Sequence, residues 1–179
     1  MIARMMMATC IALATATTGM AQDSDDAVGV KRDWTIFDNE SPRQCWVVAP
    51  PQAGKSTARR NGQSVDVNRG EIYLFVSFWP GAAAAGSQGE VSFKGGYEFA
   101  AGEFVKLQVG NQTFELFTEG DMAWATSAED DAKIAAAMKA GATAVITGIS
   151  QRTRTVTEDT FSLMGFTAAY EDARQRCSA

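Results

Sequence analysis

The fold class of this chain is set by one apolar stretch, Ile72-Tyr73-Leu74-Phe75-Val76-Ser77-Phe78-Trp79. Almost every position in it is apolar, which is typical of a strand that is covered on both faces or lies in the middle of a sheet. Pro80-Gly81 ends the run, because proline cannot donate a hydrogen bond to a β-ladder. The stretch therefore predicts a β-rich domain with a buried strand.

Further strand-like runs lie on both sides of this stretch. Val105, Leu107 and Val109 alternate with polar residues, which predicts a half-buried strand, and Gly110-Asn111 is a hairpin signal. Residues 52–62 are polar, basic and rich in turn residues, which predicts a surface loop. We expect strands at residues 34–37, 45–48, 71–79, 90–94, 104–109, 113–117, 122–125 and 143–149.

Two segments late in the chain have helical spacing. The first spans 128–140, with Ser127 as N-cap, acidic residues in its first turn and Gly141 after its last turn. The second spans about 166–177 and places five apolar residues on one face, namely Phe166, Ala169, Tyr170, Ala173 and Cys177. The whole pattern predicts a mainly β (α+β) fold, a β-sandwich-like domain with two peripheral helices, the second of them C-terminal.

The first 21 residues have the pattern of a secretory signal peptide. Arg4 supplies the positive charge, Met5–Thr17 is the apolar region, and small residues precede a cleavage site after about Ala21. The alternatives are a lipoprotein modified at Cys10 and an uncleaved anchor, for which the apolar region is too short. We therefore expect a periplasmic or secreted protein whose mature part has no transmembrane segment.

Removal of this leader also removes Cys10 and leaves Cys45 and Cys177. An even pair of cysteines in an oxidising compartment suggests one disulfide, and two buried thiols are the alternative. No Cys-x-x-Cys occurs, so a thioredoxin-like redox role has no support. The expected organisation is a signal peptide (1–21), an acidic flexible N-terminal arm (22–31) and a single β-rich domain (32–179).

The composition excludes several classes of chemistry. The chain has 179 residues, no histidine, a net charge of −5 and a pI of about 4.8. Without histidine it has no Ser-His-Asp triad, no Cys-His dyad and no histidine-ligated zinc or haem. Its negative charge makes a nucleic acid an unsuitable partner. We expect no cofactor, no metal and no nucleic acid.

Two short motifs resemble nucleotide and calcium sites but have the wrong spacing. Gly54-Lys55-Ser56 ends like a phosphate loop, but Ala49 stands where that loop needs glycine. Asp23-Ser24-Asp25-Asp26 begins like a calcium loop, but Val28 and Trp34 stand where it needs glycine and glutamate. A solvated basic loop and an acidic arm are the better interpretations.

Carboxylates and tryptophans leave two further hypotheses open. Two carboxylates at the right separation hydrolyse glycosides, and the candidates in or beside strands are Glu71, Glu90, Glu98, Glu103, Glu115 and Glu119. The alternative is that most of them face solvent. Tryptophans can form a sugar-stacking platform, although in strands they more often belong to the core. The candidates are Trp34, Trp46, Trp79 and Trp124.

Six cations could form a basic face on this acidic protein. Such a face would bind acidic glycans or lipid headgroups, and scattered solvated charge is the alternative. The residues are Lys55, Arg59, Arg60, Arg69, Arg152 and Arg154.

Several stretches together resemble the invasion-associated locus B family of alphaproteobacterial exported proteins. The most specific is Ser162-Leu163-x-Gly165-Phe166-Thr167-x-Ala169, followed by Cys177. Many relatives have a glycine in the polar stretch after Ser150, and this chain departs from them with Gln151-Arg152-Thr153-Arg154-Thr155. The resemblance covers about residues 32–177 and includes Asp33-Trp34, Gln44-Cys45-Trp46, Arg69-Gly70-Glu71-Ile72-Tyr73-Leu74, Gly95-Gly96-Tyr97 and Ala132 to Gly141.

The resemblance implies an envelope or secreted protein with a Cys45–Cys177 disulfide. Pathogenic members are linked to entry into host cells, including red cells, and the family supplies no catalytic residues to carry over. Our leading hypothesis is a non-enzymatic module that binds an envelope or host-surface protein or glycan. The alternatives are an envelope glycan hydrolase that uses paired carboxylates and a periplasmic small-ligand carrier, which would need an apolar cavity.

Overall fold

The computed structural model describes residues 27–80 and 89–178. Within these ranges the chain forms twelve strands and two helices, α1 (Ala128–Ala140) and α2 (Phe166–Cys177). Every strand pairing is antiparallel. The strands are β1 (Ala27–Lys31), β2 (Trp34–Glu40), β3 (Arg43–Ala49), β4 (Ser56–Arg60), β5 (Gln63–Ser64), β6 (Tyr73–Phe78), β7 (Glu90–Lys94), β8 (Val105–Val109), β9 (Gln112–Glu119), β10 (Met122–Ala125), β11 (Thr143–Ile149) and β12 (Val156–Ser162).

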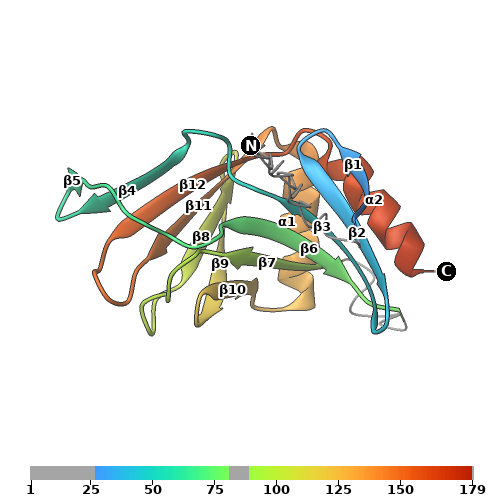
Figure 1. Ribbon diagram of the computed structural model, residues 1–179, viewed down its shortest axis with the longest axis horizontal. Helices are drawn as coiled ribbons and strands as arrows, with labels where there is room; N and C mark the ends of the chain where they lie inside the picture. Colours follow the sequence, from blue (N-terminus) through green and yellow to red (C-terminus); the bar gives the residue numbers. More distant parts are fainter. Residues whose placement is uncertain (1–26, 81–88, 179) are drawn as a thin grey trace, which may run out of the picture.

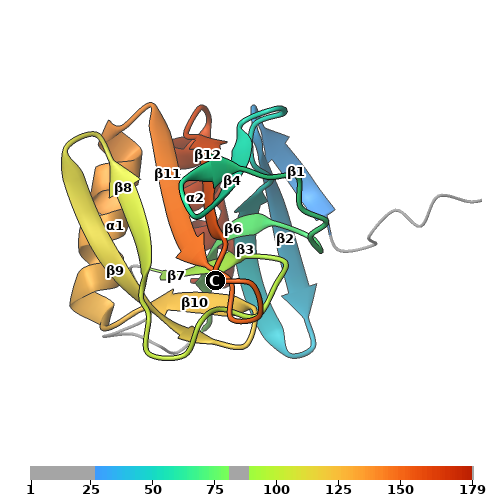
Figure 2. The ribbon, with the colours of Figure 1, turned by 90° about the vertical axis from the view of Figure 1, so that its left-hand side faces the viewer.

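All twelve strands belong to one sheet, in the order β1-β2-β3-β6-β7-β10-β9-β8-β11-β12-β4-β5. The apolar stretch becomes β6, which pairs with β3 and β7 and buries Leu74, Val76 and Phe78. In Figure 2 strands β8, β9 and β11 lie opposite β1 and β2, so the sheet curls over on itself. The expected mainly β, sandwich-like fold with two helices is therefore confirmed.

The two helices cover different parts of the sheet (Figure 1). Helix α1 packs against β7, β9 and β10, whereas α2 packs against β1, β2, β3 and β6. The buried residues of α2 are the five that its spacing predicted. The Tyr170 ring meets Phe78 edge-on, with 5.0 Å between the ring centroids. Neither α1 nor α2 is long and apolar enough to cross a membrane.

The start of α2 is joined to the start of β2. The Trp34 ring is fully buried, its Nε1 donates to Ser162 O at 3.0 Å, and its centroid lies 4.8 Å from that of Phe166. Gly165 precedes α2 with φ +87°, and a Cβ on it would lie 2.0 Å from Lys31 O. Only glycine fits there, which explains the Gly165-Phe166 pair in the sequence.

Some strands differ from the sequence-based expectation. Residues 27–31, placed in the flexible arm 22–31, form β1, because their backbone pairs with the edge of β2. The remainder of the arm and the signal peptide 1–21 lie outside the described residues. Residues 52–62, predicted as a loop, contain β4, whose backbone pairs with β12. Strand β12 itself was not predicted, because three of its buried positions are polar, Thr157, Asp159 and Ser162.

One of these polar positions takes part in a buried ion pair. The Arg69 guanidinium donates to both carboxylate oxygens of Asp159 at 2.8 Å, and their side chains are only 8% and 0% exposed. Arg69 also donates to Gly95 O at 3.0 and 2.7 Å, and its guanidinium lies 4.9 Å from the Tyr97 ring centroid. The pair therefore joins β12 to the segments that precede β6 and follow β7.

We predict that Asp159→Asn lowers the free energy of unfolding by about 3–5 kcal/mol, because it leaves the Arg69 charge buried without a counter-ion. Urea denaturation measures the loss. The control is Glu103→Gln, whose pair with Arg154 has side chains that are 42% and 59% exposed. That change should lower the free energy of unfolding by less than about 1 kcal/mol. Equal effects of the two variants would contradict the prediction.

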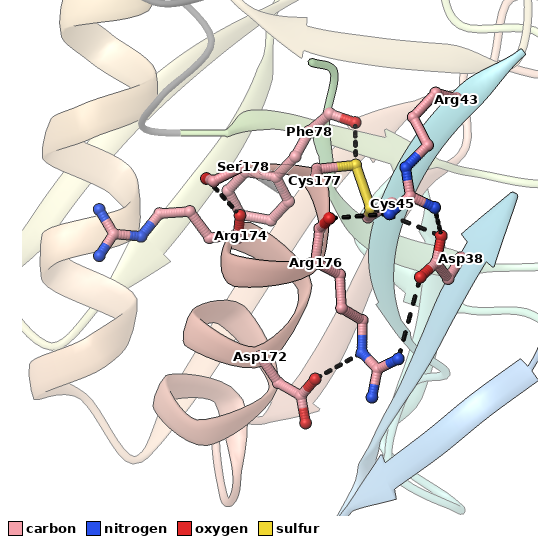
Figure 3. Close-up of a disulfide and its surroundings, with 9 residues drawn as sticks. All are labelled: Asp38, Arg43, Cys45, Phe78, Asp172, Arg174, Arg176, Cys177 and Ser178. Atoms are coloured by element: carbon pink, nitrogen blue, oxygen red, sulfur yellow. Dashed lines mark hydrogen bonds and ion pairs between the residues drawn. A yellow bond between two sulfur atoms is a disulfide. The ribbon is translucent and has the colours of Figure 1, made fainter. Parts of the chain in front are cut away.

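A disulfide joins α2 to the sheet. Cys45 in β3 and Cys177 at the end of α2 are bonded, with Cα atoms 5.8 Å apart and a sequence separation of 132. Figure 3 shows the polar groups around the bond. Arg43 pairs with Asp38 and donates to Arg176 O at 2.8 Å, and Arg176 Nε donates to Asp172 at 2.6 Å. The hydrogen bond from Arg43 and an ion pair of 3.8 Å between Arg176 and Asp38 therefore hold the same helix end as the disulfide.

We predict that replacing both cysteines with serine lowers the free energy of unfolding by about 2–5 kcal/mol, because the disulfide closes a long loop in the unfolded chain. Alkylation of the unreduced wild-type protein, followed by peptide mass spectrometry, is the companion measurement. It should find Cys45 and Cys177 unmodified, and modification of both would refute the bond.

Candidate functional site

Three of the six predicted cations line one cavity of about 250 Å³, which we call the cationic pocket. Arg60 comes from β4, Arg69 from the segment before β6, and Arg152 from the turn between β11 and β12. The cavity exists because β4 pairs with β12 and so lies beside that turn. Its other lining residues are Asp66, Val67, Asn68, Tyr97, Ser150, Thr153, Thr155 and Thr157.

Hydroxyl groups form a network on the wall of the cationic pocket. Arg60 Nε donates to Thr155 Oγ1 at 2.9 Å, and Thr155 Oγ1 lies 2.8 Å from Thr153 Oγ1. Tyr97 Oη and Thr157 Oγ1 lie 2.6 Å apart. Burial raises the pKa of Tyr97, so its hydroxyl stays neutral at physiological pH. The network presents uncharged donors and acceptors beside the guanidinium groups.

The charge that the cationic pocket offers to a ligand comes from Arg60 and Arg152. Arg69 is already neutralised by Asp159. In the described part of the chain, neither Arg60 nor Arg152 forms an ion pair with a carboxylate. Asp66 is the one carboxylate among the described residues that line the pocket. Two unpaired guanidinium groups therefore lie beside the hydroxyl network.

The other three predicted cations do not line this pocket. Arg59 precedes Arg60 on β4, so its side chain leaves the opposite face of the sheet. Arg154 pairs with Glu103 at 2.6 Å. Lys55 is exposed just before β4, where its backbone oxygen accepts from Thr160 N. The basic face thus divides into one pocket and three separate surface charges.

A second cavity, of about 460 Å³, lies where α1 begins beside β7, β9 and β10. We call it the aromatic–acidic cavity, after its aromatic side chains Trp79, Phe117 and Trp124 and its carboxylates Glu90, Glu119 and Asp131. The Phe117 and Trp124 rings stack, with centroids 5.5 Å apart and an interplanar angle of 25°. Trp79 is 38% exposed and Phe117 is 42% exposed, so ring surface is open to a ligand.

Sequence reasoning missed the third carboxylate of this cavity. Asp131 has the position of an ordinary first-turn acid of α1, but it is only 9% exposed and its Oδ1 accepts from Val91 N at 2.7 Å. Burial, with smaller contributions from Glu90 and Asp130, raises its pKa to about 6. Burial also raises the pKa of Glu90. No sequence signal marks this burial, because it depends on where β7 lies.

The remaining carboxylates and tryptophans lie outside the aromatic–acidic cavity. Glu71 and Glu98 line a further cavity of about 590 Å³, and Glu115 is exposed on β9. Trp34 belongs to the core. Trp46 stacks on Phe37 and lines a groove of about 310 Å³ that shares Trp79 and Glu90 with the aromatic–acidic cavity. The structure therefore unites Trp79 and Trp124 with Glu90 and Glu119.

The buried carboxyl of Asp131 gives the protein a predicted pH dependence. Its pKa of about 6 exceeds its usual value of 3.8, so the free energy of unfolding should fall as pH rises from about 4 to about 6. The loss is at most about 3 kcal/mol. Asp131→Asn keeps an acceptor for Val91 N and should flatten this part of the stability–pH curve.

Urea denaturation across this pH range measures the effect. Glu129→Gln, an exposed neighbour in the same turn of α1, is the control and should leave the slope intact. A slope in Asp131→Asn equal to that of the wild type would contradict the assignment.

Comparison with known proteins identifies the family. The sequence model described as invasion associated locus B (IalB) protein matches residues 39–174. The crystal structure of invasion associated protein B from Bartonella henselae matches with a TM-score of 0.52 at 15% identity, over 79% of this chain and 91% of that chain. No curated protein matches. The structural likeness establishes the fold, and the sequence match extends over most of the chain. The chain therefore belongs to the invasion associated locus B family.

Proposed function

We propose that this protein is a non-enzymatic, exported module that binds an acidic glycan of the cell envelope or of a host surface through the cationic pocket. The observation that carries the proposal is the convergence of Arg60 and Arg152 beside a network of hydroxyl groups. The leader sequence and membership of this family support export, with cleavage after about Ala21 and a periplasmic or secreted location.

The chemistry of the pocket suits a carboxylate or a sulfate. A guanidinium group presents several N–H donors in a planar fork, which matches the paired oxygens of such groups. Hydroxyls such as those of Thr153 and Tyr97 complement the neutral hydroxyls of a sugar. The chain as a whole is acidic, with a net charge of −5, so its surface outside the pocket repels an anionic polymer. Binding at the pocket therefore orients the glycan toward one face.

The anchoring role of the buried ion pair also supports this site. Arg69 is held by Asp159 and Gly95 O, so the wall of the pocket is ordered before a ligand arrives. Hydroxyl side chains bonded to one another and to Arg60 lose little further freedom on binding. Such preorganisation lowers the entropic cost of association.

We predict that Arg60→Gln and Arg152→Gln each weaken binding to heparin fragments, used as an acidic glycan probe, by about tenfold or more. Hydrogen bonds to charged groups contribute about 1.5–3 kcal/mol. Calorimetry at two salt concentrations measures the effect, and the wild-type affinity should fall as salt rises.

The matched control is Arg59→Gln, which makes the same charge change on the same strand but on the opposite face of the sheet. It should change the affinity less than twofold. Neutral dextran should not bind. An equal loss of affinity in Arg59→Gln and Arg60→Gln would contradict binding at the pocket, because binding would then depend only on overall charge. Cleavage of the glycan by wild-type protein would contradict the non-enzymatic part of the proposal.

A further inference from the structure

The aromatic–acidic cavity has the chemistry of a second binding site, independent of the cationic pocket. The two cavities share no described lining residue. The aromatic–acidic cavity is lined by Trp79, Phe117 and Trp124 together with Glu90, Glu119 and Asp131. The remaining lining residues are Gly89, Ala125, Ser127 and Ala128. The described lining residues include three carboxylates and neither a lysine nor an arginine.

Asp131 is the most constrained of these carboxylates. Its side chain is more than nine-tenths buried, and its Oδ1 is occupied by Val91 N. Asp131 also lines the cavity, and among the described residues its carboxylate has no lysine or arginine partner. A nearly buried carboxylate without a cationic partner among the described residues therefore lies in the wall of the cavity.

The aromatic rings favour the same kind of ligand. The face of an aromatic ring carries negative electrostatic potential and attracts organic cations. Phe117 and Trp124 contribute stacked rings from β9 and β10, and Trp79 contributes a third from the end of β6. A neutral sugar would stack on these rings but leave the carboxylate charges unneutralised, and an anion would be repelled by them.

We propose that the aromatic–acidic cavity binds the alkylammonium group of a small soluble ligand. The ring faces surround the alkyl part of the cation, and the carboxylates of Glu90, Glu119 and Asp131 neutralise its charge. The cavity volume of about 460 Å³ suits a small ligand rather than a polymer segment. The raised pKa values of Asp131 and Glu90 agree with carboxylates that lack a counter-charge.

The test uses two probes, choline and putrescine, together with 3,3-dimethyl-1-butanol, the neutral isostere of choline. Calorimetry with the mature protein should detect binding of at least one of the two amines. If choline binds, its affinity should exceed that of the neutral isostere by about tenfold or more. Binding of neither amine at millimolar concentration overturns the proposal. Equal binding of choline and the isostere also overturns it, because the cavity would then be merely apolar.

Variants locate the site. Glu90→Gln and Glu119→Gln should each weaken amine binding about fivefold or more, and Phe117→Leu should do so while it retains an apolar side chain. The matched control is Glu115→Gln, which makes the same charge change on β9 outside the cavity and should leave the affinity unchanged.

Circular dichroism and melting temperature establish that each variant is folded. Equal losses in Glu115→Gln and Glu119→Gln would overturn the assignment to this cavity. Hydrolysis of a glycan that stops in Glu90→Gln would overturn it in favour of paired-carboxylate catalysis. The outcome does not depend on the cationic pocket, because Arg60→Gln should leave amine binding intact.

Discussion

The buried pair between Arg69 and Asp159 is the interaction on which the rest of the structure depends. Its two charges are removed from water, so each is tolerable only because the other lies within hydrogen-bond distance. Arg69 belongs to the segment before β6, and Asp159 belongs to β12, which are far apart in the strand order. The pair therefore links two parts of the sheet that are not neighbours in the strand order, and the two hydrogen bonds to Gly95 O add a third segment to the same point.

The cationic pocket is built directly on this point. Arg69 and Tyr97 form part of its wall, and Thr157 lies two residues from Asp159 on the same strand. The unpaired guanidinium groups of Arg60 and Arg152 lie around this fixed centre. The buried pair and the two guanidinium groups without a counter-ion among the described residues therefore lie around one cavity. The aromatic–acidic cavity is formed by other elements: the beginning of α1 lies beside β9 and β10, and residues of all three line it.

The parts of the fold that the sequence predicted are those with a strong apolar period. Strands β7, β10 and β11 and both helices begin and end at the expected residues, because apolar alternation and helix caps are local signals. Strand β12 lacks such a signal, since its buried Asp159 is satisfied only by a residue distant in the sequence. Strand β4 was hidden for the same reason: its polar residues need the backbone of β12 as a partner.

In the candidate sites, too, the sequence predicted what depends on single residues and missed what depends on distant partners. The sequence could name Arg60 and Arg152 as cations but could not separate them from Arg59 and Arg154, because that depends on strand face and on the partner Glu103. It could name Glu90 and Glu119 but could not bring them to one cavity with Asp131. The sequence therefore identifies which side chains are charged or aromatic. Which of them lie in one cavity depends on how the strands pair.

The position of the disulfide has a consequence for the chain once a protease has cut it. Every residue between Cys45 and Cys177 lies within the covalently closed loop, which includes both helices up to Cys177 and the strands from β4 to β12. A single cut anywhere in this loop leaves two fragments that are still linked as one molecule. Cut ends in the surface turns, such as the one that carries Arg152, would remain tethered to the sheet. A nicked molecule can therefore keep its fold and its sites, and would separate into two chains only after reduction and unfolding.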